Sequence, residues 1–285
     1  MQPLLDDVAF VVTATGVLTA AAAALVGSVL VVRGQAMLTD AISHGVVFGI
    51  AATFLVTGAV SGPVQLLGAT AAGVLTVVLT QALAGSGRVR RDAATGLVFP
   101  ALFAAGVLVL SLFARDVHVD THTVLLGEIG FVWLERVPLL GLEVPRAPLV
   151  LLGVLVLDAL YVLAFHERLV AGSFDPVHAR LQGLRPGAAS LGLLVLVALT
   201  AVAALDAVGV VLFVAFAIVP AVAARLVAGS MVGVIAVAVA AASAAAVAGY
   251  PLAVSLDVSI GGTMALLTAV PLAAASAWRL ARSSA

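Results

Sequence analysis

The sequence predicts an all-α polytopic membrane protein with about nine transmembrane helices, its N-terminus outside and its C-terminus in the cytoplasm. Three observations lead to this fold class. First, 64% of the 285 residues are hydrophobic and 9% are charged, whereas a soluble domain carries about 25% charged residues. Second, apolar runs of membrane-spanning length recur along the chain. Third, the arginines fall mostly in alternate connections between these runs. Residues 1–285 are therefore predicted to form a single transmembrane domain.

Nine apolar runs are long enough for a helix to cross the hydrocarbon layer, which takes about 20 residues. Turn or charge signals such as S-G-P and G-S-G-R-V-R-R-D separate them. The predicted spans are residues 8–32, 37–58, 63–84, 93–114, 147–165, 188–205, 207–227, 231–250 and 259–278. The first run follows Asp6 and Asp7 without a basic segment, so we expect a retained helix rather than a cleaved signal.

The orientation follows from the arginines, because the cytoplasmic loops of membrane proteins are enriched in basic residues. With the N-terminus outside, ten of the thirteen arginines lie on the inner side. Arg115, Arg136 and Arg146 then lie outside. The opposite orientation would invert this ratio, so the sequence predicts an external N-terminus and a cytoplasmic C-terminus.

The stretch T-D-A-I-S-H-G, residues 39–45, places two polar side chains inside the second predicted span. Asp40 and His44 are four residues apart and therefore face the same way on a helix. Counted from Arg33, they lie roughly 10 Å and 16 Å into the membrane at about 1.5 Å per residue. A buried aspartate costs about 2.5–3.5 kcal/mol, so it must face protein, water or a cation. A carboxylate and an imidazole suit a divalent first-row metal; the alternative is an intrahelical pair that orients the helix.

Asp158, in L-G-V-L-V-L-D-A-L-Y, is another acidic residue deep within a predicted span. Such residues pair with other polar groups or mark an ion path. Two interpretations follow for Asp158: it pairs with a polar group on a neighbouring helix, or it lines the same path as Asp40. We favour the first, structural role.

The polar stretch 115–146 is predicted to lie on the extracellular side. It carries Asp120, His122 and Glu128, three potential ligands within nine positions, at or above the outer membrane surface. The segment V-L-L-G-E-I-G-F-V-W-L is predicted to form an interfacial or re-entrant helix, with Trp133 at headgroup level. The alternative for the acidic and histidine side chains is that they are simply solvated.

The second polar stretch, 166–187, is predicted to be cytoplasmic and to contain one short amphipathic helix. Asp175 stands where it would cap the N-terminus, and Pro176 would occupy the first helical position. Gly183 stands where the helix would end. This helix either lies on lipid headgroups or docks to a cytosolic partner.

Several functional classes lack support in the sequence. The chain contains no cysteine, which rules out disulfides and thiolate metal sites. A formal net charge of −1 gives no indication of nucleic-acid binding. The motifs G-x-x-x-x-G-K-[ST], G-x-S-x-G and H-E-x-x-H are absent. We therefore do not expect an enzyme, and if ATP drives this protein, a separate chain hydrolyses it.

Four stretches resemble the permease subunits of manganese, zinc and iron ABC importers, and together they span most of the chain. They are R-G-Q-A-M-L-T-D-A-I-S-H-G-V-V-F-G-I-A, S-F-D-P-V-H-A-R-L-Q-G-L, V-G-V-V-L-F-V-A-F-A-I-V-P-A-V-A-A-R-L and L-D-V-S-I-G-G-T-M-A-L-L. The first two together are specific, whereas the last two are mostly apolar. The resemblance implies that Asp40 and His44 serve a metal path.

The resemblance also implies a cytoplasmic coupling segment, residues 174–184, that seats in a groove of a separate ATPase. Its expected contact residues are Phe174, Asp175, Pro176, Val177, Arg180 and Leu181. The outer residues Asp120, His122 and Glu128 are candidates to receive the ion from an extracellular metal-binding protein or to form an outer gate. We expect a permease homodimer in the cell membrane of a prokaryote, in contact with lipid. The metal is cargo, and no permanent cofactor is expected.

The segment H-T-V-L-L-G-E-I-G-F is more similar to manganese-type members, which makes manganese the first choice. A carboxylate-rich outer loop without cysteine fits a hard cation, although the order of divalent affinities disfavours manganese at any nitrogen and oxygen site. Zinc and ferrous iron remain alternatives. In a different class, an ion-coupled secondary transporter would use Asp40, His44 and Asp158 as a proton relay. An intramembrane enzyme is the third class, and no nucleophile and base pair supports it.

Overall fold

The computed structural model describes residues 6–58, 63–113, 129–139, 141–184 and 186–283. Within these residues it has nine spans of membrane length and composition, which confirms the predicted all-α polytopic fold, whereas the orientation of the termini stays a prediction. The spans are α2 (Val8–Val32), α3 (Met37–Thr57), α4 (Pro63–Gly85), α5 (Arg91–Phe113), α7 (Arg146–Ala164), α10 (Pro186–Val208), α11 (Val210–Val227), α12 (Met231–Leu256) and, as one broken span, α13 (Ile260–Leu267) with α14 (Ala269–Ser283).

Two helix ends differ from their predicted positions, one near a proline and one near a glycine. The predicted break at Y-P-L-A-V-S-L-D is helical, because α12 continues through Pro251 to Leu256. Transmembrane helices tolerate an internal proline when neighbouring groups satisfy the freed backbone. The break between α10 and α11 lies at Gly209, which has a φ of 82°, three residues after the predicted break at Asp206.

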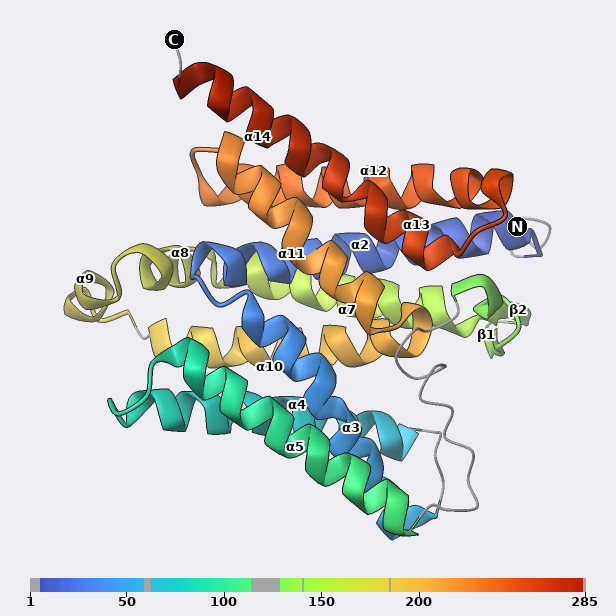
Figure 1. The fold of residues 1–285 in the computed structure, drawn as a ribbon, viewed down its shortest axis with the longest axis horizontal. Coiled ribbons are helices and arrows are strands. Elements are labelled where there is room, and N and C mark those ends of the chain that lie inside the picture. The colour runs from blue at the N-terminus through green and yellow to red at the C-terminus, as the bar shows by residue number, and fades with distance from the viewer. Residues whose placement is uncertain (1–5, 59–62, 114–128, 140, 185, 284–285) are drawn as a thin grey trace.

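The core of the bundle is built around α2, which lies between α12 and α7 in Figure 1. It also packs against α10 and α11. Its centre, Ala20–Ala24, consists of alanines that are buried or nearly so. In a membrane, helices associate through close packing of small side chains. The alanine run therefore allows several helices to surround α2 closely.

The helix that carries Asp40 and His44, α3, packs against α4 and α5 at one side of the bundle (Figure 1). Two glycines bring α3 and α4 into contact. A Cβ atom on Gly45 would overlap the hydroxyl of Thr76, and one on Gly49 would overlap the carbonyl oxygen of Gly68. Larger residues at these two positions would push α3 away from α4.

The two ends of the bundle carry different elements (Figure 1). At one end lie α8 (His166–Phe174) and α9 (Pro176–Leu181). At the other end, η1 (Ile129–Phe131) is followed by an antiparallel hairpin of β1 (Arg136–Leu139) and β2 (Leu142–Pro145). An ion pair of 2.6 Å between Arg136 and Asp6 ties the hairpin to the start of α2.

Two features of the polar stretches were not predicted. The hairpin was missed because two four-residue strands carry no clear alternating pattern, and α8 was missed because its sequence is only weakly apolar. Of the predicted interfacial helix, residues 124–128 lie outside the described part of the chain, and the described remainder begins with the short helix η1.

Candidate metal path

Asp40 and His44 face each other on the first half of α3. The His44 Nε2 atom lies 3.4 Å from the Asp40 Oδ1 atom. The side chains of His44 and Asp40 are 29% and 37% exposed in the single chain. A turn separates α2 from α3, and Met37 is the first residue of α3. Counted from Met37, Asp40 and His44 lie roughly 5 Å and 10 Å along the helix; their depth in the membrane stays a prediction.

The imidazole of His44 rests against two aromatic rings of α5. The ring of Phe99 is stacked on it at a centroid distance of 5.7 Å, and the ring of Phe103 meets it edge-on at 5.8 Å. These contacts limit rotation of the imidazole and keep its Nε2 atom directed at Asp40. Neither phenylalanine was predicted from the sequence to lie near His44. Their spacing of four residues was a usable signal, but nothing in the sequence pairs this face of α5 with α3.

A first-row divalent metal takes about four or more ligands in a protein site. The Asp40 and His44 side chains supply two. Within the described residues, no group of three or more histidine, aspartate or glutamate side chains is close enough to hold a metal. A metal held by this pair would therefore need further ligands beyond the histidine, aspartate and glutamate side chains of the described residues.

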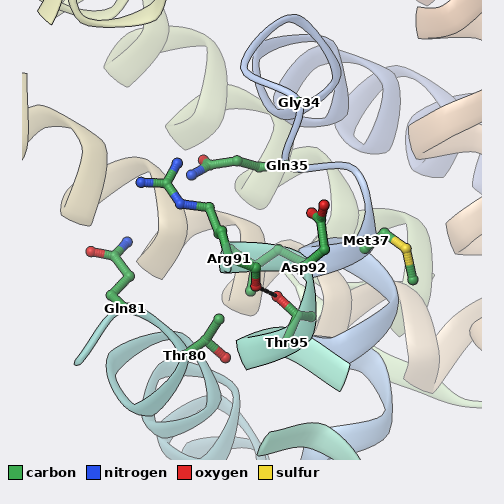
Figure 2. A pocket seen from close by; sticks show the side chains of 9 residues that line it. Gly34, Gln35, Met37, Thr80, Gln81, Arg91, Asp92 and Thr95 are labelled. Atoms are coloured by element: carbon green, nitrogen blue, oxygen red, sulfur yellow. Dashed lines mark hydrogen bonds between the residues drawn. The ribbon is translucent and has the colours of Figure 1, made fainter. Parts of the chain in front are cut away.

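A small pocket lies at the start of α3, among the α2–α3 turn, the end of α4 and the start of α5 (Figure 2). Its volume of about 20 Å³ is enough for about one water molecule. Its lining residues are Gly34, Gln35, Met37, Leu38, Thr80, Gln81, Arg91, Asp92 and Thr95. Met37 precedes Asp40 by three residues and so shares its helix face. The pocket thus lies next to the end of the Asp40–His44 face.

Asp158 is fully buried between α7 and α10. The Thr200 hydroxyl lies 2.8 Å from its Oδ2 atom and also 2.8 Å from the carbonyl oxygen of Leu196. Within the described residues, the Oδ1 atom has no hydrogen-bond partner. A polar partner on a neighbouring helix is what the structural interpretation of Asp158 predicted.

The three outer candidates, Asp120, His122 and Glu128, lie outside the described residues, so their role stays a prediction. Charged side chains of the described hairpin region contact one another. Arg146 contacts Glu135 at 2.6 Å and Asp206 at 3.6 Å. These contacts join the hairpin region to α7 and α10.

The predicted coupling segment, residues 174–184, contains one helix, α9, and the unpredicted helix α8 precedes it in the polar stretch 166–187. Helix α9 begins at Pro176, directly after Asp175, and the Ala179 N–H group donates to the Asp175 carbonyl oxygen at 3.0 Å. The helix ends before Gly183, whose φ of 75° favours glycine.

The segment also presents apolar side chains to its surroundings. Phe174, Val177 and Leu181 are 67%, 66% and 82% exposed. The side chains of Pro176 and Arg180 lie outside the described part of the structure. These three exposed apolar side chains lie within eight positions, and their contact with an ATPase stays a prediction.

Comparisons with known proteins identify the family of this chain. The chain is 41% identical to the manganese transport system membrane protein MntD of Bacillus subtilis, over 93% of this chain and 90% of that protein. It is 40% identical to the zinc transport system membrane protein TroD of Treponema pallidum, over 89% of this chain and 69% of that protein. The solved structure of PsaBC from Streptococcus pneumoniae in complex with Fab aligns with a TM-score of 0.77 at 25% identity, over 93% of this chain and 89% of that chain.

The family model described as ABC 3 transport family matches residues 6–279. This match and the named relatives confirm the resemblance to the membrane subunits of metal ABC transporters. The chain is a multi-pass membrane protein, and it belongs to the ABC 3 transport family.

Proposed function

We propose that this chain is the permease of an ATP-driven importer of divalent metal ions, with manganese as its main cargo. The observation that carries the proposal is the Asp40–His44 pair on α3, at 3.4 Å and partly exposed within a membrane-spanning helix. Ionisable groups in that position are costly and mark ion paths. In a family of ABC transporters, the pair is best explained as a step in the metal path.

The exposed side of this pair supports a permease dimer. Hydrocarbon is an unfavourable neighbour for a carboxylate that is 37% exposed. A second copy of this chain would cover it and bring another Asp40 and His44, giving four side-chain ligands about one symmetry axis. Outer faces of α5, including Leu97 at 59% and Leu108 at 58% exposure, are apolar and compatible with lipid.

Energy and cargo would come from other chains. The sequence has no phosphate-binding loop, so the proposal assigns ATP hydrolysis to separate ATPase subunits that dock on the exposed apolar residues of α8 and α9. An extracellular metal-binding protein would deliver the ion at the hairpin end, with Asp120, His122 and Glu128 as candidate receivers. The complex would lie in the plasma membrane of a prokaryote.

The choice of manganese rests on ligand chemistry and on similarity. Carboxylate oxygen ligands suit manganese, whereas imidazole suits zinc and iron as well. MntD is named for manganese transport and TroD for zinc transport, at 41% and 40% identity. Identity alone does not separate these two cargoes. Zinc is therefore the second candidate, and ferrous iron the third.

The proposal is tested in proteoliposomes that contain the chain, its ATPase and the metal-binding protein. We expect uptake of radiolabelled Mn²⁺ that requires ATP, and stronger competition by unlabelled Mn²⁺ than by Zn²⁺ or Fe²⁺. Asp40→Asn and His44→Ala should each reduce uptake by about 100-fold or more, since each removes about half of one chain's ligands. Co-purification of the ATPase should not change.

Asp257→Asn is the matched control. Asp257 lies at the end of α12 with a φ of 53°, a conformation that asparagine adopts readily, so uptake should stay at the wild-type level. Uptake that follows a proton gradient without ATP would point to the secondary-transporter alternative. Wild-type rates in Asp40→Asn or His44→Ala would place the path elsewhere.

A further inference from the structure

Arg33 joins the end of α2 to the segment expected to contact the ATPase. Its Nε atom donates to the Ser173 hydroxyl at 2.8 Å, and its Nη1 atom donates to the Ser190 hydroxyl at 2.9 Å. Its Nη2 atom donates to the carbonyl oxygen of Leu169 at 3.2 Å. One guanidinium group therefore holds the last turn of α8 and the first turn of α10 against α2. Burial lowers the pKa of Arg33 from its ordinary value, as expected for a cation partly removed from water.

The connection from Arg33 to the metal path is short and hydrogen-bonded. The Gln35 N–H group donates to the Leu30 carbonyl oxygen at 2.8 Å, and the Thr39 N–H group donates to the Ala36 carbonyl oxygen at 3.1 Å. Helix α3 starts at Met37. A movement imposed on Arg33 would thus reach α3 through a short turn that is held by backbone hydrogen bonds.

A second arginine also reaches the end of α2, but from a different direction. The Arg225 Nη1 atom, from the last turn of α11, donates to the carbonyl oxygen of Val31 at 3.3 Å. Arg225 fastens α2 to the bundle, whereas Arg33 fastens it to α8 and α10. Ser173 immediately precedes Phe174, the exposed residue at the end of α8. Arg225 is therefore a general anchor of α2, whereas Arg33 links α2 to the predicted coupling segment.

We propose that Arg33 is a positioning residue that transmits movement of α8 and α9 to α3, and so to Asp40 and His44. The inference rests on the proposed function. When the ATPase displaces α8 and α9, Ser173 and Leu169 move with them. The planar guanidinium group holds three acceptors in fixed directions. The end of α2 and the α2–α3 turn then follow α8, and the ligand pair changes position during each ATP cycle.

The test measures metal uptake and ATP hydrolysis in the same proteoliposomes of the complete transporter. For Arg33→Gln, we expect the amount of Mn²⁺ imported per ATP hydrolysed to fall by about tenfold, within the usual range of coupling between sites. ATPase co-purification and hydrolysis should stay within about twofold of wild type, because the docking residues of α9 are intact. Arg33→Lys keeps the positive charge but loses the planar guanidinium group. Its amount of Mn²⁺ imported per ATP hydrolysed should therefore lie between those of the wild type and Arg33→Gln.

A purely structural role for Arg33 would lower protein yield, uptake and hydrolysis together and leave their ratio unchanged. The double variant Ser173→Ala and Ser190→Ala removes two acceptors while keeping Arg33, and it should lower the ratio in the same direction. Arg225→Gln is the matched control and should keep the wild-type ratio. An unchanged ratio in both Arg33→Gln and the serine variant overturns the inference. Absence of ATP-dependent uptake in the wild type instead overturns the proposed function.

Discussion

Asp158 illustrates how this bundle keeps a carboxyl group inside the membrane. Its side chain is fully buried, and its Oδ2 atom accepts a hydrogen bond from Thr200 of α10. The Thr200 hydroxyl has one hydrogen but lies 2.8 Å from two acceptors, the Asp158 Oδ2 atom and the Leu196 carbonyl oxygen. A donor in place of the Asp158 Oδ2 atom would therefore satisfy both contacts at once.

This hydrogen-bond count leads to a prediction. Asp158→Asn supplies an N–H donor to the Thr200 oxygen, so the free energy of unfolding should change by less than about 1 kcal/mol. Asp158→Ala removes the link between α7 and α10 and should cost about 1–3 kcal/mol. Thermal unfolding of the detergent-solubilised protein measures both. If Asp158→Asn is stable but does not transport metal, Asp158 belongs to the ion path rather than to the scaffold.

The sequence was sufficient to select Asp40 and His44, because their spacing of four residues is meaningful on any helix. It was not sufficient to select Phe99 and Phe103, which contact His44 from a helix more than fifty residues further along the chain. Such a contact depends on how α3 and α5 are rotated about their axes. Arg33 was noted only as a marker of the membrane edge, since its partners are equally remote in sequence.

At the scale of elements, the spans were predictable because the membrane requires long apolar helices. The nine predicted runs correspond to the nine spans found among the described residues, including the broken span of α13 and α14. Helix ends were less predictable near Pro251, which lies inside α12, and near Gly209, which precedes α11. The β1–β2 hairpin lies outside the spans. There the requirement for long apolar helices does not apply, and short strands depend on local pairing.

Helix α9 gives the prediction at this scale. Val177→Asp and Leu181→Asp place charges on the two most exposed apolar side chains of the helix. If these side chains enter an ATPase groove, each charge should weaken docking by about 2 kcal/mol or more, as at interface hot spots. Pull-down of the ATPase with the solubilised permease measures the loss, and membrane insertion should be normal.

Ser86→Asp is the control for added charge, since Ser86 is an exposed residue of the α4–α5 turn, outside α9. It should leave ATPase binding nearly unchanged. Full ATPase recovery with both α9 variants would favour the alternative in which α9 rests on lipid headgroups.

At the scale of the whole molecule, the opposite placement of α9 and the β1–β2 hairpin allows the predicted orientation to be tested (Figure 1). The chain contains no cysteine, so a single introduced thiol is unique. Glu143→Cys lies in the hairpin and Ser86→Cys in the α4–α5 turn, and both positions are exposed. In right-side-out vesicles, a membrane-impermeant maleimide should label Glu143→Cys at once and Ser86→Cys only after permeabilisation. The reverse pattern would invert the orientation derived from the arginines.

The central position of α2 has a consequence for how the protein is made. Ribosomes add roughly 5–20 residues per second, so α2 enters the membrane roughly ten seconds or more before α12, which packs against it. During that time its inner face meets lipid or an insertase. The hydroxyls of Thr15, Thr19 and Ser28 already donate to carbonyl oxygens four residues earlier in the same helix. These three buried hydroxyls of α2 are therefore already paired while the helix lies in the bilayer, before the last helices to be synthesised enclose it.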